Sequence, residues 1–560
     1  MTPDAPWQKF YKDIRSTLSY PEGSLCEAVF STAEKYPDAT AIIYKSGCVS
    51  FREMTQRIIN LQSAFESIGI KPGDRVAVCL PNIPQAVYSL YALNRMGAVS
   101  CFLHPLSAAG EFAMYINESQ CDFVIALDSL ATVFEEVFKV TGEKTLIITS
   151  PADELNFIKR ITYTFTKKRT ASPKNKSIVL WNDLLKKSAG VADVVKRDKN
   201  KLAVILFSGG TTGAPKGVML SDFNINAMAI QTLKMCNCKT VGASILAAMP
   251  MFHGFGLGVS VHTALVGGAA CILIPRFNPK EYASLIKKYH PNFIVGVPTL
   301  FEALMRCKNL NNTDLSCLRG VFSGGDALSA ELRQKFDDFL QEHRASVRIR
   351  EGYGSTECVA VSCLTPYNTR RDGSVGIPVS DNFIKICKAG SDVEIACGEV
   401  GEICISGPSV MMGYLNDEEE NKKVLKLHTD KRIWLHSGDL GYMDSDGFVY
   451  YKQRLKRLII SNGYNVYPSQ VESVLNNYCG VKESCVTGIR DSYKMQRIKA
   501  YVVLNEEYST DEITRKEILH YCRKHIARYA VPDELVFVSS LPRTKLGKIA
   551  YTELEAVSDN

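Results

Sequence analysis

The stretch LFSGGTTGAPKGVML, Leu206–Leu220, follows on a continuous apolar run, Leu202–Phe207, that predicts a buried strand. Its glycines permit positive φ and let backbone N–H groups come close to an anion. Its serine and two threonines supply further donors, and Lys216 supplies a positive charge. Ser221 is a suitable N-cap for a helix that follows. The stretch therefore predicts a strand and then a loop that holds phosphates.

This loop is not a P-loop of the Walker A type. That motif requires G-x-x-x-x-G-K-[ST], in which the lysine directly follows a glycine and opens a helix. Here Lys216 follows Pro215 and precedes Gly217, so we expect the lysine to lie in the loop and to start no helix. The dinucleotide pattern G-x-G-x-x-G is absent from the loop as well. The loop therefore argues against a P-loop NTPase.

The order S-G-G-T-T-G-x-P-K-G instead resembles the phosphate loop of the adenylate-forming superfamily, which comprises acyl-CoA synthetases, nonribosomal peptide adenylation domains and beetle luciferases. The resemblance implies a mobile loop that grips the β- and γ-phosphates of ATP while a carboxylate attacks the α-phosphate. Gly209 stands where many members carry serine, and this replacement of serine by glycine is seen in fatty-acid-type relatives. The loop residues implied in ATP binding are Ser208, Gly209, Gly210, Thr211, Thr212, Gly213 and Lys216.

Two glycine-rich segments follow in the order that the resemblance requires. PMFHGFGLG, residues 250–258, places His253 between a strand end and a turn, and the resemblance implies that this histidine lies near the mouth of the acyl pocket. Gly254 and Gly256 would let the backbone line that pocket. GVFSGGDALS, residues 320–329, pairs a strand with a turn and a helix start, and in relatives it lies beside the adenine. Its candidate residues are Ser323, Gly324 and Gly325.

The segment EGYGSTE, residues 351–357, brings an aromatic ring, a hydroxyl and a carboxylate together. Tyr353 offers a ring to stack on adenine, with Gly354 beside it, and Thr356 offers a donor for the α-phosphate. Glu357 offers the hard oxygen ligand that Mg²⁺ prefers. We therefore expect Glu357 to be the metal ligand, and Glu357, Thr356 and His253 to be catalytic residues.

The last elements place ribose and CoA contacts in the C-terminal third. Asp439 matches the aspartate that holds the ribose hydroxyls, and Arg454 follows at the expected distance, although Gln453 replaces the usual glycine and Arg457 the usual acidic residue. Lys456 matches the hinge between domains, and Gly463 lies in the segment that walls the pantetheine tunnel of CoA ligases. In PRTKLGKIAYTEL, Lys548 matches the lysine that bridges the substrate carboxylate and the α-phosphate.

The alternation of apolar strand-like runs with helical patterns predicts an α/β protein. Apolar runs at 74–82, 121–127 and 144–150 read as buried strands, and 84–99 reads as a helix packed between the first two. From about residue 376, short strands punctuated by glycine predict a small β-barrel-like subdomain. We expect an N-terminal AMP-binding domain over 1–455 with layered α/β sheets, and a small mobile α+β domain over 456–560 that carries Lys548.

Composition bounds the remaining possibilities. The net charge of +7 arises mainly between residues 155 and 182, where seven basic residues meet no acidic one, so a protein-wide nucleic-acid surface is not expected. That basic segment is either a solvated loop or a patch for anionic membrane. The apolar run at 257–275 is interrupted by His262 and a Gly-Gly pair, which favours a buried helix–turn–strand. The 18 scattered cysteines and the absence of an export signal indicate free thiols in the cytoplasm, and no metal beyond Mg²⁺.

The resemblance implies an AMP-forming ligase that joins a carboxylic acid to CoA through an acyl-adenylate, using ATP, Mg²⁺ and CoA. A medium- or long-chain fatty acid is expected because the predicted pocket residues carry no charge that would pair with a second carboxylate or an amino group. An aryl or bile acid, transfer to a carrier protein, and a non-catalytic nucleotide sensor are the alternatives. The predicted pocket residues are Phe252, Phe255, Gly256, Val297, Pro298, Thr299, Val359 and Ala360.

Overall fold

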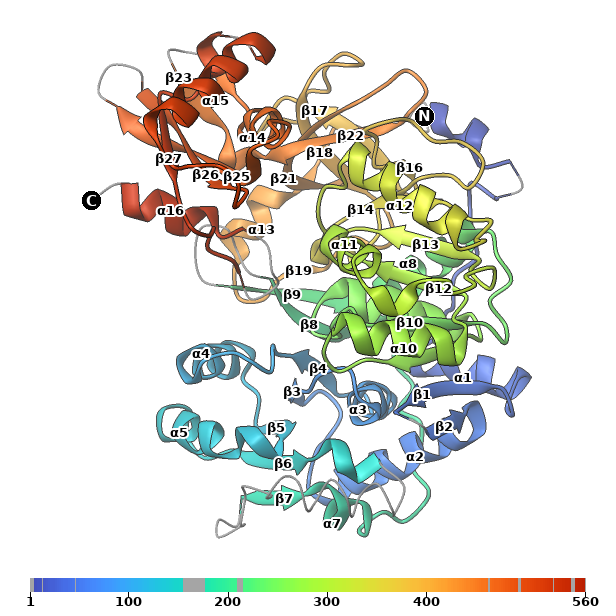
Figure 1. Ribbon diagram of the computed structural model, residues 1–560. Coiled ribbons are helices and arrows are strands. Elements are labelled where there is room, and N and C mark those ends of the chain that lie inside the picture. The colour runs from blue at the N-terminus through green and yellow to red at the C-terminus, as the bar shows by residue number, and fades with distance from the viewer. Residues whose placement is uncertain are drawn as a thin grey trace. The chain divides into compact units, whose positions relative to one another are not determined.

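The structure is a computed structural model that describes residues 5–12, 14–45, 47–154, 177–208, 215–461, 464–491, 495–526, 528–544 and 549–558. The described chain forms two compact units (Figure 1). Unit 1 contains the described residues up to 208, together with 215–383 and 405–427. Unit 2 contains 384–404 and the described residues from 428 onward.

The first sheet of unit 1 is parallel at its centre and antiparallel at both edges. Its central strands are short, β-branched and buried on both faces, as expected where helices cover a parallel sheet. In spatial order the strands are β16 (Ile377–Pro378), β15 (Cys363–Leu364), β14 (Ile349–Tyr353), β13 (Gly320–Ser323), β12 (Phe293–Gly296), β10 (Ser244–Ala247), β11 (Ala270–Leu273), β1 (Thr40–Tyr44) and β2 (Gly47–Ser50).

The second sheet of unit 1 carries the strand that leads into the phosphate loop. It is parallel from β8 to β7, and β9 and β19 add antiparallel strands at one edge. In spatial order the strands are β19 (Gly413–Tyr414), β9 (Lys216–Ser221), β8 (Leu202–Ser208), β4 (Val99–Phe102), β3 (Arg75–Cys79), β5 (Phe123–Leu127), β6 (Thr145–Thr149) and β7 (Ile178–Leu180).

Helices cover these sheets in the way that their apolar faces dictate. One core joins the first sheet to α10–α12, and another joins the second sheet to α4 and α5. Every residue of α3 is buried, which is the property of a helix with neighbours on all sides. The helices of unit 1 are α1 (Leu25–Lys35), α2 (Phe51–Ser67), α3 (Pro84–Arg95), α4 (Ala109–Ser119), α5 (Ala131–Thr141), α7 (Trp181–Leu185), α8 (Asp222–Cys236), α9 (Ala264–Val266), α10 (Pro279–Tyr289), α11 (Pro298–Met305), α12 (Ala330–Glu342) and α13 (Glu418–Val424), after which comes β20 (Leu425–Leu427).

Unit 2 contains antiparallel strands followed by a small α+β part. The strands β17 (Phe383–Cys387), β18 (Gly401–Ser406), β21 (Ile433–Met443) and β22 (Val449–Arg454) belong to one sheet. A second sheet packs against α14 and α15 around an apolar core. Its elements are β23 (Ile459–Ser461), β24 (Tyr464–Val466), α14 (Pro468–Asn476), β25 (Val481–Asp491), β26 (Met495–Leu504), α15 (Glu512–His525) and β27 (Glu534–Phe537), and α16 (Tyr551–Ser558) follows.

The elements predicted from sequence are present. The strands expected at 74–82, 121–127 and 144–150 are β3, β5 and β6, and Ser221 caps α8 by accepting from the backbone N–H of Asn224 at 3.1 Å. The apolar run at 257–275 is a buried π-helical turn, a short helix and strand β11. The described part of the chain holds no helix with the length and apolarity that a membrane crossing demands. The predicted α/β fold class is confirmed.

Candidate active site

Lys216 occupies the end of the phosphate loop that the structure describes. It begins strand β9, where it pairs with Ser208 of β8, so it starts a strand and no helix, as predicted. Its Nζ atom lies 2.5 Å from Oε1 of Glu420 and 5.0 Å from the centre of the Tyr414 ring. Glu420 therefore balances the lysine charge. The predicted loop residues Gly209, Gly210, Thr211, Thr212 and Gly213 lie outside the described residues.

Glu357 and Lys216 contact the same side chain, that of Tyr414. It sits in a 3-10 turn, Thr356–Cys358, and its Oε1 accepts a hydrogen bond of 2.9 Å from the Tyr414 hydroxyl. The backbone N–H of Met411 donates to the Glu357 carbonyl at 2.8 Å, so the segment that carries Tyr414 is joined to this turn twice. The predicted metal ligand and the predicted phosphate lysine thus flank one tyrosine.

The turn after Glu357 is conformationally strained. Val359 has φ +63°, which a β-branched residue rarely adopts and which costs about 1–3 kcal/mol. A Cβ atom on Gly254 would lie 1.6 Å from the carbonyl oxygen of Val359, so only glycine fits there. The His253 turn therefore packs backbone to backbone against the turn of Thr356, which is buried. Gly254 is therefore required for this close approach of the two turns.

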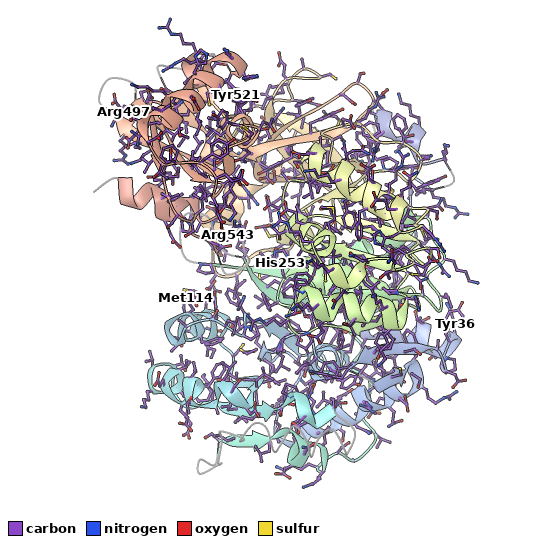
Figure 2. The ribbon with its side chains drawn as sticks, in the orientation of Figure 1. Tyr36, Met114, His253, Arg497, Tyr521 and Arg543 are labelled. Atoms are coloured by element: carbon purple, nitrogen blue, oxygen red, sulfur yellow. The ribbon has the colours of Figure 1, made fainter. Side chains whose placement is uncertain are left out.

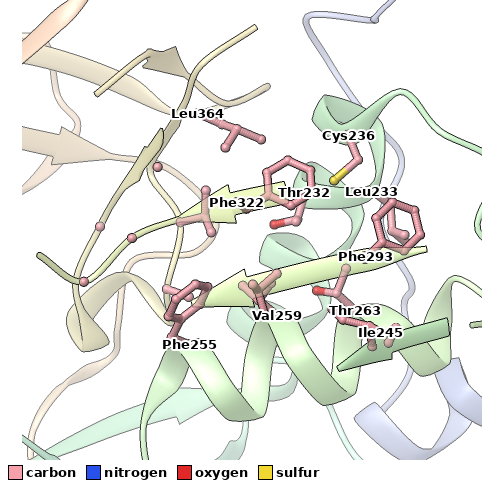
Figure 3. A pocket seen from close by; sticks show the side chains of 18 of the residues that line it. Thr232, Leu233, Cys236, Ile245, Phe255, Val259, Thr263, Phe293, Phe322 and Leu364 are labelled. Atoms are coloured by element: carbon pink, nitrogen blue, oxygen red, sulfur yellow. The ribbon is translucent and has the colours of Figure 1, made fainter. Parts of the chain in front are cut away.

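A cavity lies between α8, the turn Phe255–Thr263 and the first sheet. Five predicted site residues line it: His253, Ser323, Gly324, Gly325 and Gly354. Figure 3 shows Phe255 on one side of the cavity, and Cys236, Thr263 and Phe293 on the other. No lysine, arginine, aspartate or glutamate of the described chain is among the lining residues. The cavity can therefore hold an uncharged, apolar group.

This cavity includes two of the eight residues that were predicted for the acyl pocket. Phe255 and Ala360 line it, but the other six do not belong to its lining in the described chain: Phe252, Gly256, Val297, Pro298, Thr299 and Val359. The sequence analysis missed Thr232, Leu233 and Cys236 of α8, which contribute one wall. The sequence carried little signal for this wall, because the buried residues of α8 include polar ones such as Asn224, Asn226 and Gln231.

Tyr353 and His253 complete the predicted set in unit 1. Tyr353 ends strand β14 and is 8% exposed, so its ring is held by the sheet. His253 precedes the π-helical turn, where its Nδ1 accepts from the backbone N–H of Phe255 at 3.4 Å (labelled in Figure 2). Both residues thus lie at the ends of regular elements, where the backbone fixes them.

The ribose candidates of unit 2 face each other across two strands. Asp439 of β21 pairs in register with Arg454 of β22, and the Nε atom of Arg454 lies 3.0 Å from Oδ1 of Asp439. Asp439 is buried, and Arg454 also donates to the carbonyl of Ser437 at 3.2 Å. Lys456 lies in the 3-10 turn Leu455–Arg457 that follows.

Arg457 lies next to the predicted hinge residue Lys456. Arg457, which stands where an acidic residue is usual, pairs with Glu472 inside unit 2. This ion pair gives the unusual arginine a partner. Gly463 and Lys548 lie outside the described residues, as do residues 155–176 of the basic segment.

Two family descriptions match this chain. The AMP-binding enzyme family matches residues 29–415, and the AMP-binding enzyme C-terminal domain matches residues 470–548. The chain belongs to the AMP-binding enzyme family and, within the adenylate-forming superfamily, to the acyl-CoA synthetases. The predicted superfamily and enzyme class are thereby confirmed, with ATP, CoA and a carboxylic acid as the substrates of that class.

Nearly the whole chain is similar to proteins named as CoA ligases. It is 33% identical over 566 residues to a long-chain-fatty-acid–CoA ligase of Bacillus subtilis, covering 99% of this chain and 98% of the relative. It is 31% identical to a long-chain-fatty-acid–CoA ligase of Haemophilus influenzae, covering 94% and 93%. A probable 4-coumarate–CoA ligase of Dictyostelium discoideum is 26% identical, covering 98% of each.

Solved structures share the fold. ATP-bound MatB from Rhodopseudomonas palustris has a TM-score of 0.84 at 24% identity, covering 96% of this chain and 99% of that one. The anthranilate CoA ligase AuaEII in complex with anthranoyl-AMP has a TM-score of 0.81 at 21% identity, covering 98% of both chains. These similarities concern the fold.

Proposed function

We propose that this chain activates a medium- or long-chain fatty acid. The acid and ATP give an acyl-adenylate and pyrophosphate, and the CoA thiol then displaces AMP to give the acyl-CoA. The observation that carries the proposal is the uncharged cavity that is lined by His253, Gly354 and residues of α8. Burial of an acyl chain in this cavity would stabilise the bound state by about 0.8 kcal/mol for each methylene that leaves water.

The absence of charge from the cavity lining supports a fatty acid over an α-amino acid or a diacid. An α-amino acid needs a carboxylate for its ammonium group, and a diacid needs a cation for its second carboxylate, because an unpaired buried charge is costly. The described lining contains neither. The full-length similarity to long-chain-fatty-acid–CoA ligases supports the same choice.

The residues near Glu357 are suited to the adenylation half-reaction. Two anions, a carboxylate and a triphosphate, must meet, so positive charge and fixed positions supply most of the catalysis. Glu357 would hold Mg²⁺, which neutralises phosphate charge, and the Tyr414 hydroxyl orients that carboxylate. Lys216 lies within reach of the same tyrosine and would bind the outer phosphates once it leaves Glu420.

The nucleoside contacts are proposed by residue. Tyr353 would stack on adenine, with Ser323, Gly324 and Gly325 beside the base, and Asp439 and Arg454 would hold the ribose. Thr356 would donate to the α-phosphate, and His253 would lie beside the acyl carboxylate at the mouth of the cavity. The loop residues from Ser208 to Gly213 would hold the outer phosphates, and Gly463 would line the path of CoA.

The division of labour between domains is also a proposal. Residues 1–455 would form the acyl and ATP site, and residues 456–560 would turn about Lys456 between the half-reactions and carry Lys548 to and from the α-phosphate. The basic segment at 155–182 as a membrane contact, and a cytoplasmic location, are proposed on composition alone. A separate carrier protein could replace CoA as the acceptor, and parallel assays with CoA and a holo-carrier protein would separate the two.

Carboxylate-dependent ATP–pyrophosphate exchange tests this function. Saturated fatty acids of 6 to about 18 carbons, cinnamic and benzoic acids, a bile acid and α-amino acids should be compared at equal concentration. We expect exchange that rises with fatty chain length through the medium range. Exchange confined to aryl or bile acids would replace the fatty-acid assignment by that alternative. Absence of exchange with every acid would favour a nucleotide sensor.

A further inference from the structure

The backbone just before Asp439 is bent within strand β21. Gly438 has φ +67°, a left-handed value that removes its N–H from the regular ladder. Ser437 secures the bend, because its hydroxyl donates to the carbonyl of Ile403 at 2.6 Å and accepts from the backbone N–H of Asp439 at 3.1 Å. The direction of the Asp439 carboxylate therefore depends on what holds residues 437–439.

Glu402 of the neighbouring strand β18 holds this bend. Its Oε1 accepts the displaced N–H of Gly438 at 3.1 Å. Its Oε2 accepts from the backbone N–H of Gly390 at 3.0 Å and from Nδ1 of His436 at 2.9 Å. Glu402 is 4% exposed and His436 is 5% exposed, so each bond forms away from water. One buried carboxylate thus fastens three points around the bend.

The charge of Glu402 is stabilised where it lies. Burial alone would raise the pKa of this carboxyl, but the bonds from His436, Gly390 and Gly438 hold its pKa below the ordinary value. On the opposite edge of the His436 ring, its Nε2 atom lies 3.0 Å from Nε2 of His428. An ionised carboxylate can accept all three hydrogen bonds. A protonated carboxyl would instead place its own O–H donor against one of the three N–H donors.

A metal site is the competing interpretation of this cluster. Ligand atoms of Glu402, Cys404 and His436 lie within 4.8 Å of one another. The hydrogen bonds favour the positioning role, because the two oxygens of Glu402 and Nδ1 of His436 already satisfy one another and two backbone N–H groups. A metal ion would have to break the bond between Glu402 and His436.

We propose that Glu402, together with Ser437, is a positioning residue that presents Asp439 to the ribose hydroxyls of ATP. This inference rests on the proposed function, in which Asp439 binds those hydroxyls. Glu402 does not touch the nucleotide in this role. It acts by fixing the bend from which Asp439 extends, and Arg454 supports the same bend from β22.

The experiment measures how strongly the full-length enzyme prefers ATP over 2′,3′-dideoxy-ATP, which lacks the ribose hydroxyls. The ratio of the two kcat/KM values is compared in wild type, Asp439→Asn, Glu402→Gln and Glu472→Gln. Glu472→Gln is the matched control, because Glu472 also accepts a backbone N–H, from Val486 at 2.8 Å, within unit 2 but away from the bend. Bound zinc is measured in the same wild-type preparation.

We expect Glu402→Gln to lower kcat/KM for ATP by about 10- to 100-fold, the usual effect of losing a hydrogen bond to a charged group, and to change the dideoxy value little. The ratio should fall as in Asp439→Asn and stay at the wild-type level in Glu472→Gln. If the ratio falls in Asp439→Asn but stays at the wild-type value in Glu402→Gln, the positioning role of Glu402 is wrong and the ribose assignment of Asp439 still holds. A wild-type ratio in Asp439→Asn would overturn the ribose assignment, and this inference with it. One equivalent of zinc per chain would overturn the positioning role in favour of the metal site.

A milder variant covers the case in which Glu402→Gln yields too little folded protein. Ser437→Ala removes the hydroxyl that joins Asp439 to Ile403 and leaves Glu402 in place. We expect the same ratio to fall about threefold, in line with the loss of one neutral hydrogen bond. An unchanged ratio in Ser437→Ala would contradict the proposal.

Discussion

The Tyr414 hydroxyl donates a hydrogen bond of 2.9 Å to Oε1 of Glu357, and the two residues are 57 positions apart in the chain. Tyr414 belongs to β19, whose neighbour β9 begins with Lys216. One tyrosine therefore links the strand that leaves the phosphate loop to the carboxylate that we propose as the magnesium ligand. We therefore propose that Tyr414 positions Glu357, a role that no motif indicated.

Replacement of these two residues should have graded effects. Glu357→Gln keeps the size of the side chain but removes its charge, so we expect adenylation to slow by at least ~10²-fold, comparable with the loss of a preorganised group at other sites. Tyr414→Phe removes only the orienting hydroxyl and should slow adenylation about tenfold. Magnesium titrations of ATP–pyrophosphate exchange measure both effects. A Tyr414→Phe loss as large as that of Glu357→Gln would contradict the distinction.

Lys548→Ala should separate the two half-reactions. We expect adenylation to fall by at least ~10²-fold, because Lys548 would neutralise both reacting anions. Thioester formation from preformed acyl-adenylate should change much less, because the C-terminal domain would carry Lys548 away for that step. Single-turnover assays of each half-reaction make the comparison. Equal losses in both would argue against the proposed role.

Chain-length preference should depend on the wall formed by α8. Cys236→Phe adds a ring to a buried position of the cavity lining, so the longest acids should be rejected first. Each methylene that no longer fits should cost about 0.8 kcal/mol, or about fourfold in kcat/KM. Cys238→Phe is the matched control, because Cys238 is half-exposed and does not belong to the lining within the described chain. The same truncated preference in both variants would disprove the role of this wall.

Acid should destabilise unit 1 through His262. This ring is fully buried, with Nδ1 3.1 Å from the Tyr91 hydroxyl and Nε2 2.8 Å from Oδ1 of Asn226, and burial lowers its pKa to about 3. The unfolded chain, with an ordinary histidine pKa near 6.5, binds the proton first. Stability should therefore be lost as pH falls from 6.5 toward 3, by up to about 1.4 kcal/mol per pH unit.

Thermal unfolding between pH 7.5 and 5.0 measures this loss. His262→Gln removes the titrating group, so its melting temperature should lie below that of the wild type at pH 7.5 and approach it at pH 5.0. The exposed His290 provides the control, since His290→Gln should follow the wild type at every pH. A constant difference between wild type and His262→Gln across the range would show that His262 contributes no acid sensitivity.

Much of the fold could be predicted because its signals are local. The apolar run before Ser208 forms β8, and Ser221 caps α8, since strand and cap preferences depend on neighbouring residues. The cavity was predicted less well. Val297 and Thr299 follow the buried strand β12, yet they do not line the cavity in the described chain, whereas Cys236 at the end of α8 does. The direction of a side chain depends on how its helix packs, and that packing is not a local property.

The sequence by itself determined the order of the elements, the phosphate-loop strand, and the residue types that adenylation chemistry requires at Tyr353, Glu357 and Asp439. Only the tertiary structure decided that Tyr414 serves Glu357, and that Glu402 holds the bend before Asp439 from 34 or more positions away. The reason is physical: strand pairing brings distant backbones together, and a buried carboxylate or hydroxyl finds its partner there because leaving it unpaired away from water is costly.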